Sequence, residues 1–136
     1  MLGDRIGEVK GKITGERVLD VEGPKIEYSF SASGTMKGVD ITHIATFWTI
    51  PRGYGVLYCE GQGVMTTTDG SGEIATEVGR GIGQLTDRAK KGKFHGSFFY
   101  RASPTGKLAL LNNIVGMFEY EVDEAGNTFH KVWEWK

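Results

Sequence analysis

The sequence predicts an all-β protein, folded as a single eight-stranded antiparallel up-and-down barrel over residues 1–136. Runs of alternating apolar and polar residues recur along the chain, and turn-forming residues separate most of them. No run of ten residues shows the 3.6-residue periodicity of an amphipathic helix. Eight twisted strands with aromatic side chains on one face close readily into a small barrel, which also removes exposed strand edges. A β-sandwich is the alternative arrangement of the same strands.

The composition indicates a folded protein and disfavours nucleic-acid binding. Glycine accounts for 21 of the 136 residues, about twice the usual share, whereas proline accounts for only 3. The net charge of −1, from 16 basic and 17 acidic residues, lacks the basic excess of a nucleic-acid-binding domain. The densest basic cluster, Arg88–Lys93, is more typical of a solvated loop than of a phosphate site.

The same residues give expectations about location and cofactors. Cys59 is the single cysteine, so neither an intramolecular disulfide nor a paired-cysteine metal site is available. The first residues lack the apolar segment of a signal peptide, and no stretch approaches the roughly 18 apolar residues of a membrane span. The three histidines lack metal-ligand spacing, and Gly79–Gly83 lacks the lysine of a phosphate-binding loop. We therefore expect a cytoplasmic protein without membrane contact, metal or cofactor.

Alternation and turn residues give the boundaries of the eight expected strands. Asp87–Gly92 is expected to form a charged loop, and Ser103–Asn113 to cover one end of the barrel with its leucines. The strands are Ile6–Val21, Lys25–Ser33, Val39–Ile50, two arms within Gly53–Leu85 joined through Thr68–Gly72, Lys93–Ala102, Ile114–Val122 and Thr128–Lys136.

The hairpin Gly53–Leu85 carries an unusual set of glycines on one face. Gly61 and Gly63 share a face of its first arm, and three further glycines, at positions 79, 81 and 83, share a face of its second arm. Glycine inside a strand usually marks a sharp bend or the close approach of another group. A glycine face therefore requires either bulky side chains or an empty space opposite it.

Turn positions predict which residues pair across this hairpin. A turn at Pro51–Gly53 would place His43 opposite Gly61, and a turn at Thr68–Gly72 would place Gly61 opposite Gly79 and Gly63 opposite Glu77. The glycine face then points inward, because the neighbouring positions on that face are apolar. Aromatic side chains of other strands are expected to face it, and they either fill the interior or line a cavity: Tyr28, Phe30, Phe94, Phe98, Tyr100, Phe118, Tyr120, Trp133 and Trp135.

Three segments carry a resemblance to a known family. They are Glu60-Gly61-Gln62-Gly63, Gly79-Arg80-Gly81-Ile82-Gly83 and Phe118-Glu119-Tyr120-Glu121. In size and glycine pattern the chain resembles the small antiparallel barrels of the allene oxide cyclase-like type, a calycin-like architecture with many uncharacterised prokaryotic members. The resemblance implies a barrel with an internal cavity, often oligomeric, and it does not imply the cyclase reaction.

His43 and Glu77 are the candidate catalytic residues. Both are expected on the inward face, on strands separated only by the strand of Gly61 and Gly63. A histidine beside a carboxylate in an apolar cavity is a general acid–base arrangement. Alternatively, His43 hydrogen-bonds a buried tyrosine hydroxyl and Glu77 lies at the solvated mouth. Glu60 and Arg80 are expected to form an outward ion pair that supports the register.

Three functions fit these expectations. In the first, the barrel binds a small, mostly apolar molecule. In the second, it is a cofactor-free isomerase or cyclase that uses His43 and Glu77. In the third, a filled barrel acts as an assembly module through its outer surface. The candidate ligand-binding residues for the first are Tyr28, Cys59, Gly61, Gly79, Tyr100 and Tyr120.

An apolar outer face predicts self-association. Ile44, Trp48 and Ile50 point outward on the third expected strand, with Val56 and Tyr58 beside them. Contiguous exposed aliphatic and aromatic side chains mark interaction surfaces. Because closed symmetry is the default for self-association, we expect a homodimer or a homotrimer.

Overall fold

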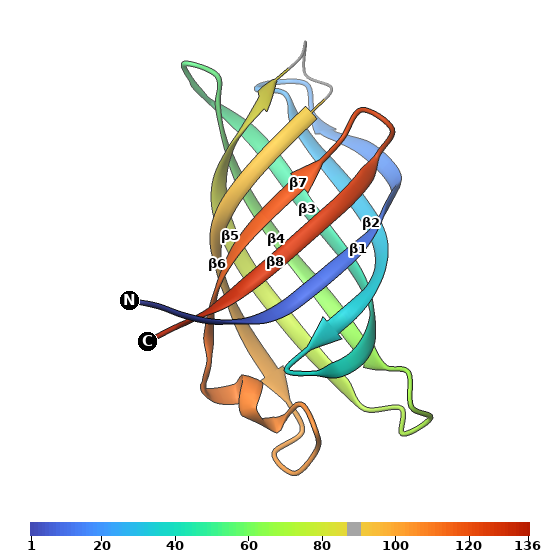
Figure 1. The fold of residues 1–136 in the computed structure, drawn as a ribbon. Helices are drawn as coiled ribbons and strands as arrows, with labels where there is room; N and C mark the ends of the chain where they lie inside the picture. Colours follow the sequence, from blue (N-terminus) through green and yellow to red (C-terminus); the bar gives the residue numbers. More distant parts are fainter. Residues whose placement is uncertain (87–90) are drawn as a thin grey trace.

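The computed structural model describes residues 1–86 and 91–136, and it confirms the expected barrel (Figure 1). Each strand pairs antiparallel with the next, and β8 pairs with β1 to close the sheet. The strands are β1 (Leu2–Asp20), β2 (Lys25–Met36), β3 (Val39–Gly53), β4 (Val56–Thr67), β5 (Ile74–Thr86), β6 (Lys91–Ala102), β7 (Val115–Val122) and β8 (Asn127–Trp135).

The β3–β4 register differs from the predicted one. His43 pairs with Met65 instead of Gly61, and Phe47 pairs with Gly61. Strand β3 continues through the expected turn, and the chain reverses at Tyr54 and Gly55, both of which have positive φ angles. The shift of four residues is even, so every side chain keeps its predicted face.

The β4–β5 register is as predicted, with Gly61 opposite Gly79, Gly63 opposite Glu77 and Glu60 opposite Arg80. The expected loop Asp87–Gly92 was placed only partly correctly. Its residues 87–90 lie outside the described part of the chain, whereas Lys91 and Gly92 belong to β6.

The inward face of β8 was predicted wrongly. Trp133 and Trp135 were expected inside, but Trp135 is exposed and Trp133 only half-buried. The buried residues of this strand are Thr128, His130 and Val132. They pair directly with inward residues of β7, and directly paired residues share a face of the sheet.

Aromatic rings cover most of the glycine face. A Cβ atom added at Gly79 would lie 2.3 Å from a ring carbon of Phe98, and one added at Gly83 would lie 2.1 Å from a ring carbon of Phe94. Side chains therefore fill much of the barrel, and the glycines allow rings to lie against the backbone of β5.

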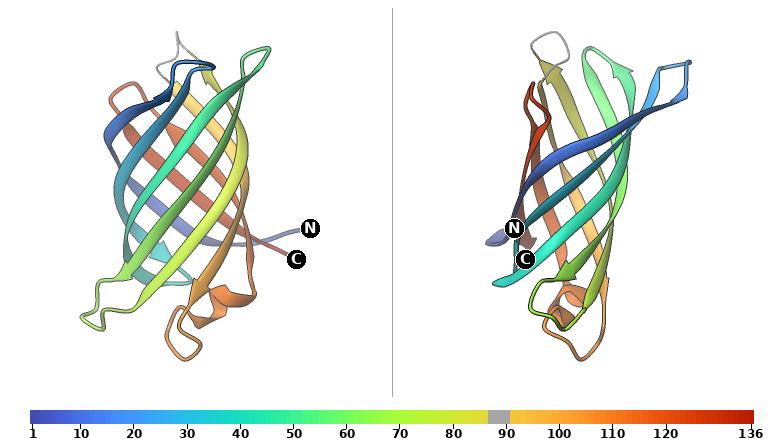
Figure 2. Two further views of the ribbon diagram at one scale, coloured as in Figure 1. Left: turned by 180° about the vertical axis from the view of Figure 1, so that it is seen from behind. Right: turned by 90° about the vertical axis from the view of Figure 1, so that its right-hand side faces the viewer.

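A short segment covers one end of the barrel, as predicted for 103–113. Its 3-10 helix η1 (Ala109–Asn113) follows Leu108, and both Leu108 and Leu111 are fully buried. The Glu73 carboxylate holds this segment, because it accepts hydrogen bonds from the backbone N–H groups of Lys107 (3.0 Å) and Leu108 (2.8 Å). The opposite end, with the β1–β2, β3–β4 and β7–β8 turns, has no such cover in the described part of the chain (Figures 1 and 2).

Replacing Glu73 should loosen this cover. We expect Glu73→Ala to lower the free energy of unfolding by about 1–3 kcal/mol, because the backbone N–H groups of Lys107 and of the buried Leu108 lose a charged acceptor. Urea unfolding and hydrogen exchange at the Leu108 amide measure the effect. Glu119→Ala, which removes an exposed carboxylate from β7, is the matched control. Equal stability of the two variants would show that Glu73 does not anchor the segment.

Candidate functional site

A histidine and a glutamate meet inside the barrel, from β3 and β5. His43 Nε2 lies 2.5 Å from Glu77 Oε1, and the two side chains are 2% and 5% exposed. Gly63 of the intervening strand β4 makes room for this contact, since an added Cβ would lie 2.7 Å from Nε2 and 2.8 Å from Oε1. The structure therefore brings together the two residues that the sequence nominated. Their separation is short, but the two groups are not aligned as an ordinary hydrogen bond.

His130 of β8 completes this polar cluster. Its ring centroid lies 6.1 Å from that of His43, and it is buried among aromatic rings. The sequence reasoning missed it, because the tryptophans of β8 were assigned to the interior. The turn expected at 123–127 contained the missing signal, since it pairs His130 with the inward Tyr120. The surrounding rings belong to Phe30, Phe98, Phe118 and Tyr120.

Burial keeps His130, Tyr100 and Tyr120 uncharged. Desolvation lowers the pKa of His130 to about 4, and the charge of Glu77 opposes that shift. Desolvation also raises the pKa values of the Tyr100 and Tyr120 hydroxyls above their ordinary range. At neutral pH the interior therefore presents one neutral imidazole and two neutral phenols beside the His43–Glu77 pair.

Several of these groups have buried polar atoms without a hydrogen-bond partner. They are both ring nitrogens of His43, His130 Nε2 and the hydroxyls of Tyr100 and Tyr120. The alternative in which His43 bonds a tyrosine hydroxyl is therefore wrong. An unsatisfied buried polar group costs about 1–3 kcal/mol, so the interior holds unused capacity to bind a polar atom.

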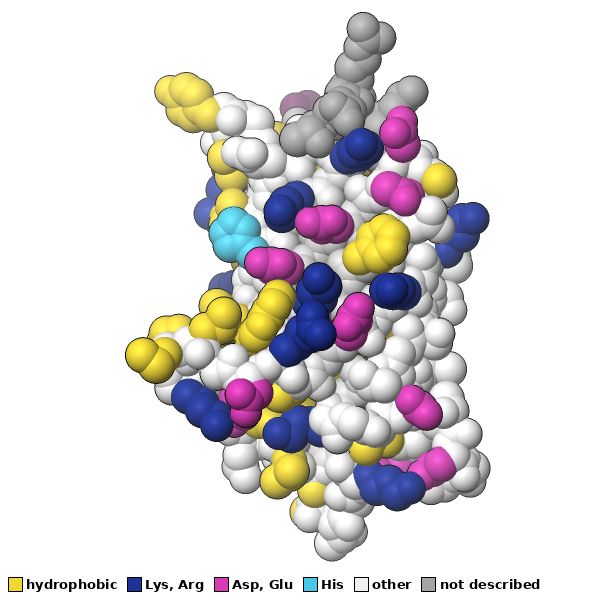
Figure 3. Space-filling view, viewed as in Figure 1, with side chains coloured by type: hydrophobic (Ala, Val, Ile, Leu, Met, Phe, Trp, Pro, Cys, Tyr) yellow, Lys and Arg dark blue, Asp and Glu magenta, His cyan; other side chains and the backbone are white. Residues whose placement is uncertain are grey.

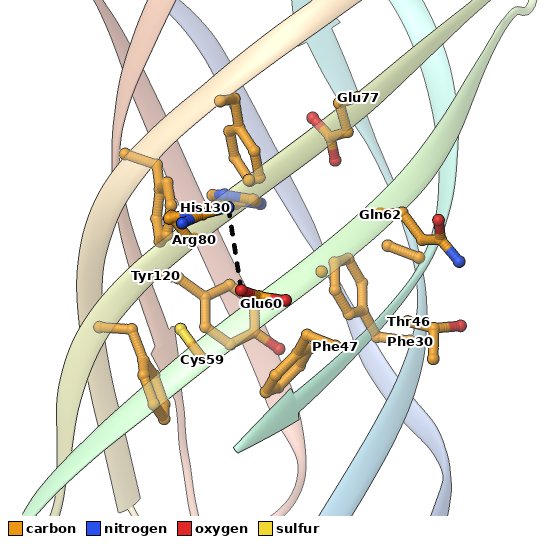
Figure 4. A pocket seen from close by; sticks show the side chains of 16 residues that line it. Phe30, Thr46, Phe47, Cys59, Glu60, Gln62, Glu77, Arg80, Tyr120 and His130 are labelled. Atoms are coloured by element: carbon orange, nitrogen blue, oxygen red, sulfur yellow. Dashed lines mark ion pairs between the residues drawn. The ribbon is translucent and has the colours of Figure 1, made fainter. Parts of the chain in front are cut away.

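A small cavity of about 50 Å³ lies within this interior (Figure 4). This exceeds the roughly 10–15 Å³ that a cavity needs to hold a water molecule. Figure 4 shows Cys59 on the inner side of β4 and Glu60 on the outer side, where a dashed line joins Glu60 to Arg80. The inward side chains and glycines around the cavity are Phe30, Ala45, Phe47, Cys59, Gly61, Glu77, Gly79, Phe94, Phe98, Phe118, Tyr120 and His130.

A larger pocket of about 740 Å³ opens at the uncovered end of the barrel. Phe47 and Phe94 line both this mouth and the inner cavity, with ring centroids 6.1 Å apart, so these two rings separate the two spaces. The mouth combines apolar and polar lining in about equal parts, and Glu16, Asp123 and Glu124 make part of it acidic. Its other described lining residues are Ile13, Tyr28, Thr49, Leu57, Leu85, Val122, Ala125 and Gly126.

Five of the six predicted ligand-binding residues line these two spaces, and Tyr100 lines neither. Tyr28 lies in the mouth, stacked on Phe47 with centroids 5.2 Å apart. Tyr100 is buried and pairs with Glu77 in the β5–β6 register. The other four line the inner cavity: Cys59, Gly61, Gly79 and Tyr120. Burial raises the pKa of the Cys59 thiol to about 11, so this thiol is protonated at neutral pH.

Neither a metal cluster nor a membrane helix is found in the described residues. No group of three or more His, Cys, Asp and Glu side chains in residues 1–86 and 91–136 could hold a metal ion. No helix in these ranges has the length and apolar character needed to cross a membrane.

Comparisons with known proteins identify the fold. No family model matches the sequence, and no curated protein is significantly similar to it. A solved structure of a protein of unknown function from Clostridium acetobutylicum is 10% identical, with a TM-score of 0.81 and 98% of both chains covered. A conserved protein of unknown function from Rhodopseudomonas palustris is 11% identical, with a TM-score of 0.78 and coverage of 98% of this chain and 97% of that one.

A third solved structure is a β-barrel-like protein from Acinetobacter baumannii. It is 12% identical with a TM-score of 0.78, and the match covers 100% of this chain and 96% of that one. At such low identity these likenesses show the fold alone. The protein shares a whole-chain eight-stranded barrel with proteins of unknown function.

His130 should make stability depend on pH. The pKa of histidine is about 6.5 in an unfolded chain and about 4 for His130 in the folded protein. Between these values the unfolded chain binds a proton that the folded protein does not, so stability falls as the pH falls from about 6.5 to 4. The expected loss is on the order of 3 kcal/mol.

The comparison of wild type with His130→Phe in urea at pH 7, 5.5 and 4 tests this. The variant should lose less stability than wild type over the same interval. Asp69 and Asp123, whose pKa values are lowered, contribute only below about pH 3.8. Parallel pH profiles for the two proteins would contradict a buried neutral His130.

Proposed function

We propose that the protein binds a small, mostly apolar molecule in the mouth of its barrel, with a polar group of that molecule directed toward the buried cluster. The mouth volume of about 740 Å³ supports this, because ligand pockets typically measure about 300–1,000 Å³. The apolar part of its lining, which includes Leu57, Leu85 and Phe94, suits an apolar body, and Tyr28 is positioned to contact it.

The observation that carries the proposal is the set of unpartnered polar atoms below the mouth. His130 Nε2 and the Tyr120 hydroxyl lie within the aromatic interior and have no hydrogen-bond partner. A ligand's oxygen or nitrogen atom could satisfy them, once the rings of Phe47 and Phe94 turn aside. Because the imidazole and the phenol are neutral, an uncharged polar group suits them best.

A substitution that fills the mouth tests the proposal. Leu57→Trp places a larger side chain in the mouth, whereas Val64→Trp places one on the outer face of the same strand. The uncharged fluorescent probe N-phenyl-1-naphthylamine should bind wild type and Val64→Trp, and should bind Leu57→Trp at least about tenfold more weakly. Equal binding to both variants, or no binding to wild type, would reject the proposal.

A second candidate function is proton transfer on a bound carbonyl compound, as in a cofactor-free isomerase or cyclase. The 2.5 Å contact between buried His43 and Glu77 favours it. Glu77 would take a proton from the carbon beside the carbonyl, and His43 would hydrogen-bond the developing enolate oxygen. Deuteration of acetophenone at that carbon in D2O, accelerated by wild type and not by Glu77→Gln, would support this candidate.

We also infer that the barrel is of the allene oxide cyclase-like type and that the protein is cytoplasmic. The residues that resemble allene oxide cyclase-like barrels lie in β4, β5 and β7, two of which line the inner cavity through their glycines. A cytoplasmic location is compatible with a single free cysteine, since disulfide frameworks mark small secreted proteins.

A further inference from the structure

An exposed apolar surface crosses four neighbouring strands on the outside of the barrel. We call the side chains of Ile44, Val64, Val78 and Phe99 the outer apolar face. Ile44 pairs with Val64, and Val78 pairs with Phe99. Val64 lies two residues along β4 from Gln62, which pairs with Val78. Ile44, Val78 and Phe99 are 61%, 55% and 54% exposed. Contiguous exposed side chains of this kind mark an interaction surface.

The strands of this surface contrast with the face of β6, β7, β8 and β1 shown in Figure 3. On that face acidic and basic side chains lie among one another over the middle, hydrophobic side chains gather along its left edge, and Lys93 pairs with Glu121 at 3.5 Å. Figure 2 shows β3, β4 and β5 side by side on the other side of the barrel. The outer apolar face therefore lies on the side of the barrel away from the charged middle of the face in Figure 3.

Trp48 and Tyr58, which the sequence placed on the expected interaction surface, lie at the border of this face and not at its centre. The ring of Trp48 is half-buried beneath the Lys25 ammonium group, 4.2 Å from the ring centroid. The ring of Tyr58 is similarly covered by the Arg52 guanidinium group at 4.1 Å. An apolar centre with a polar border is the usual anatomy of a protein interface.

Charge identifies the partner. Beside Val78 and Phe99, a groove of about 430 Å³ contains Glu60 and Arg80, whose side chains are 37% and 72% exposed. The Tyr58 hydroxyl donates to Glu60 Oε1 at 2.5 Å, and Arg80 lies 3.9 Å from the same atom, so Glu60 Oε2 and the exposed guanidinium of Arg80 retain capacity for another partner. A two-fold rotation would bring Arg80 of one molecule to Glu60 of the other, twice in the same interface.

We infer that the outer apolar face binds a second copy of this chain and forms a two-fold symmetric dimer. Val78 and Phe99 form the centre, and reciprocal Glu60–Arg80 pairs flank it. A standard interface covers about 800 Å² of each partner, which is about a tenth of the 7897 Å² surface of this protein. This inference is independent of the ligand proposed above, because it concerns outward-pointing side chains.

Sedimentation velocity from 1 to 100 µM tests the dimer. Wild type should dimerise, and Phe99→Lys should raise the dissociation constant at least about 30-fold, as loss of a central hot spot does. Phe129→Lys, at an exposed aromatic residue of β8, is the control and should leave the dimer unchanged. A monomeric wild type at 100 µM, or an unchanged Phe99→Lys dimer, would overturn the inference.

Charge reversal tests the symmetry separately. Arg80→Glu alone and Glu60→Arg alone should each be monomeric, because like charges then meet across the axis. A mixture of these two variants should dimerise, since each molecule then offers the charges that the other lacks. Failure of the mixture to dimerise, with both variants folded by circular dichroism, would overturn the reciprocal pairing.

Discussion

Gly81→Ala is expected to destabilise the barrel by at least the upper part of the roughly 1–3 kcal/mol typical of overpacking. The new Cβ would lie 2.4 Å from the backbone oxygen of His95 and 3.0 Å from a ring carbon of Phe118. A backbone oxygen in a paired strand cannot move aside as a flexible side chain can. Relief therefore requires β5 and β6 to separate where they pair through Gly81 and Gly96. Urea unfolding measures the loss.

Gly15→Ala is the matched control for that substitution. Gly15 also lies within a strand, but nothing approaches within 4 Å of the position of its added Cβ. Without a clash, replacing a strand glycine by alanine should leave stability unchanged or raise it by about 0.5–1 kcal/mol. Equal unfolding midpoints for Gly81→Ala and Gly15→Ala would show that the glycines of β5 do not govern packing.

Glu77→Leu is expected to lower the free energy of unfolding by about 1–3 kcal/mol, the cost of leaving a buried polar group without its partner. In this variant His43 remains buried, 2% exposed, and its Nε2 atom loses its contact with the Glu77 carboxylate. Chemical unfolding at neutral pH measures the loss. Leucine has a volume similar to that of glutamate, so the main change is the loss of the carboxylate.

A double variant separates the pair from general packing. In His43→Phe/Glu77→Leu both polar groups are absent, and apolar replacements of a buried pair are often neutral or stabilising. We expect the double variant to recover most of the stability that Glu77→Leu loses. Additive losses in the two single variants and the double variant would mean that His43 and Glu77 do not act as a pair.

The barrel could be predicted because its signals are local. Alternation assigned most strands to a face, and a short turn after Thr67 fixed the β4–β5 register through Gly63 and Glu77. The β3–β4 register failed because Pro51 and Gly53 look like a turn, yet β3 continues to Gly53 through a register shift. Proline and glycine are found both in turns and at register shifts within strands, and only the pairing of the strands decides which of the two forms.

The candidate site was predicted in part. His43 and Glu77 were found because both occupy odd-numbered positions, which face inward on β3 and β5. The glycines of β4 left the space between them open. His130 was missed because the aromatic residues of β8 lie at odd positions, whereas the interior takes the even ones. Hydrophobicity misled there, since Trp133 and Trp135 lie near the end of β8, where Trp135 pairs with Leu2 at the start of β1.

By itself the sequence determined the all-β class, most of the strands, the inward glycine face and the two ionisable residues beside it. These follow from a period of two and from turn chemistry, which act over a few residues. Only the tertiary structure decided that aromatic rings reduce the inner cavity to about 50 Å³, that His130 joins the cluster and that the mouth lies opposite η1. Those features depend on how side chains from non-adjacent strands fill one closed interior, and such packing is set by the whole barrel at once.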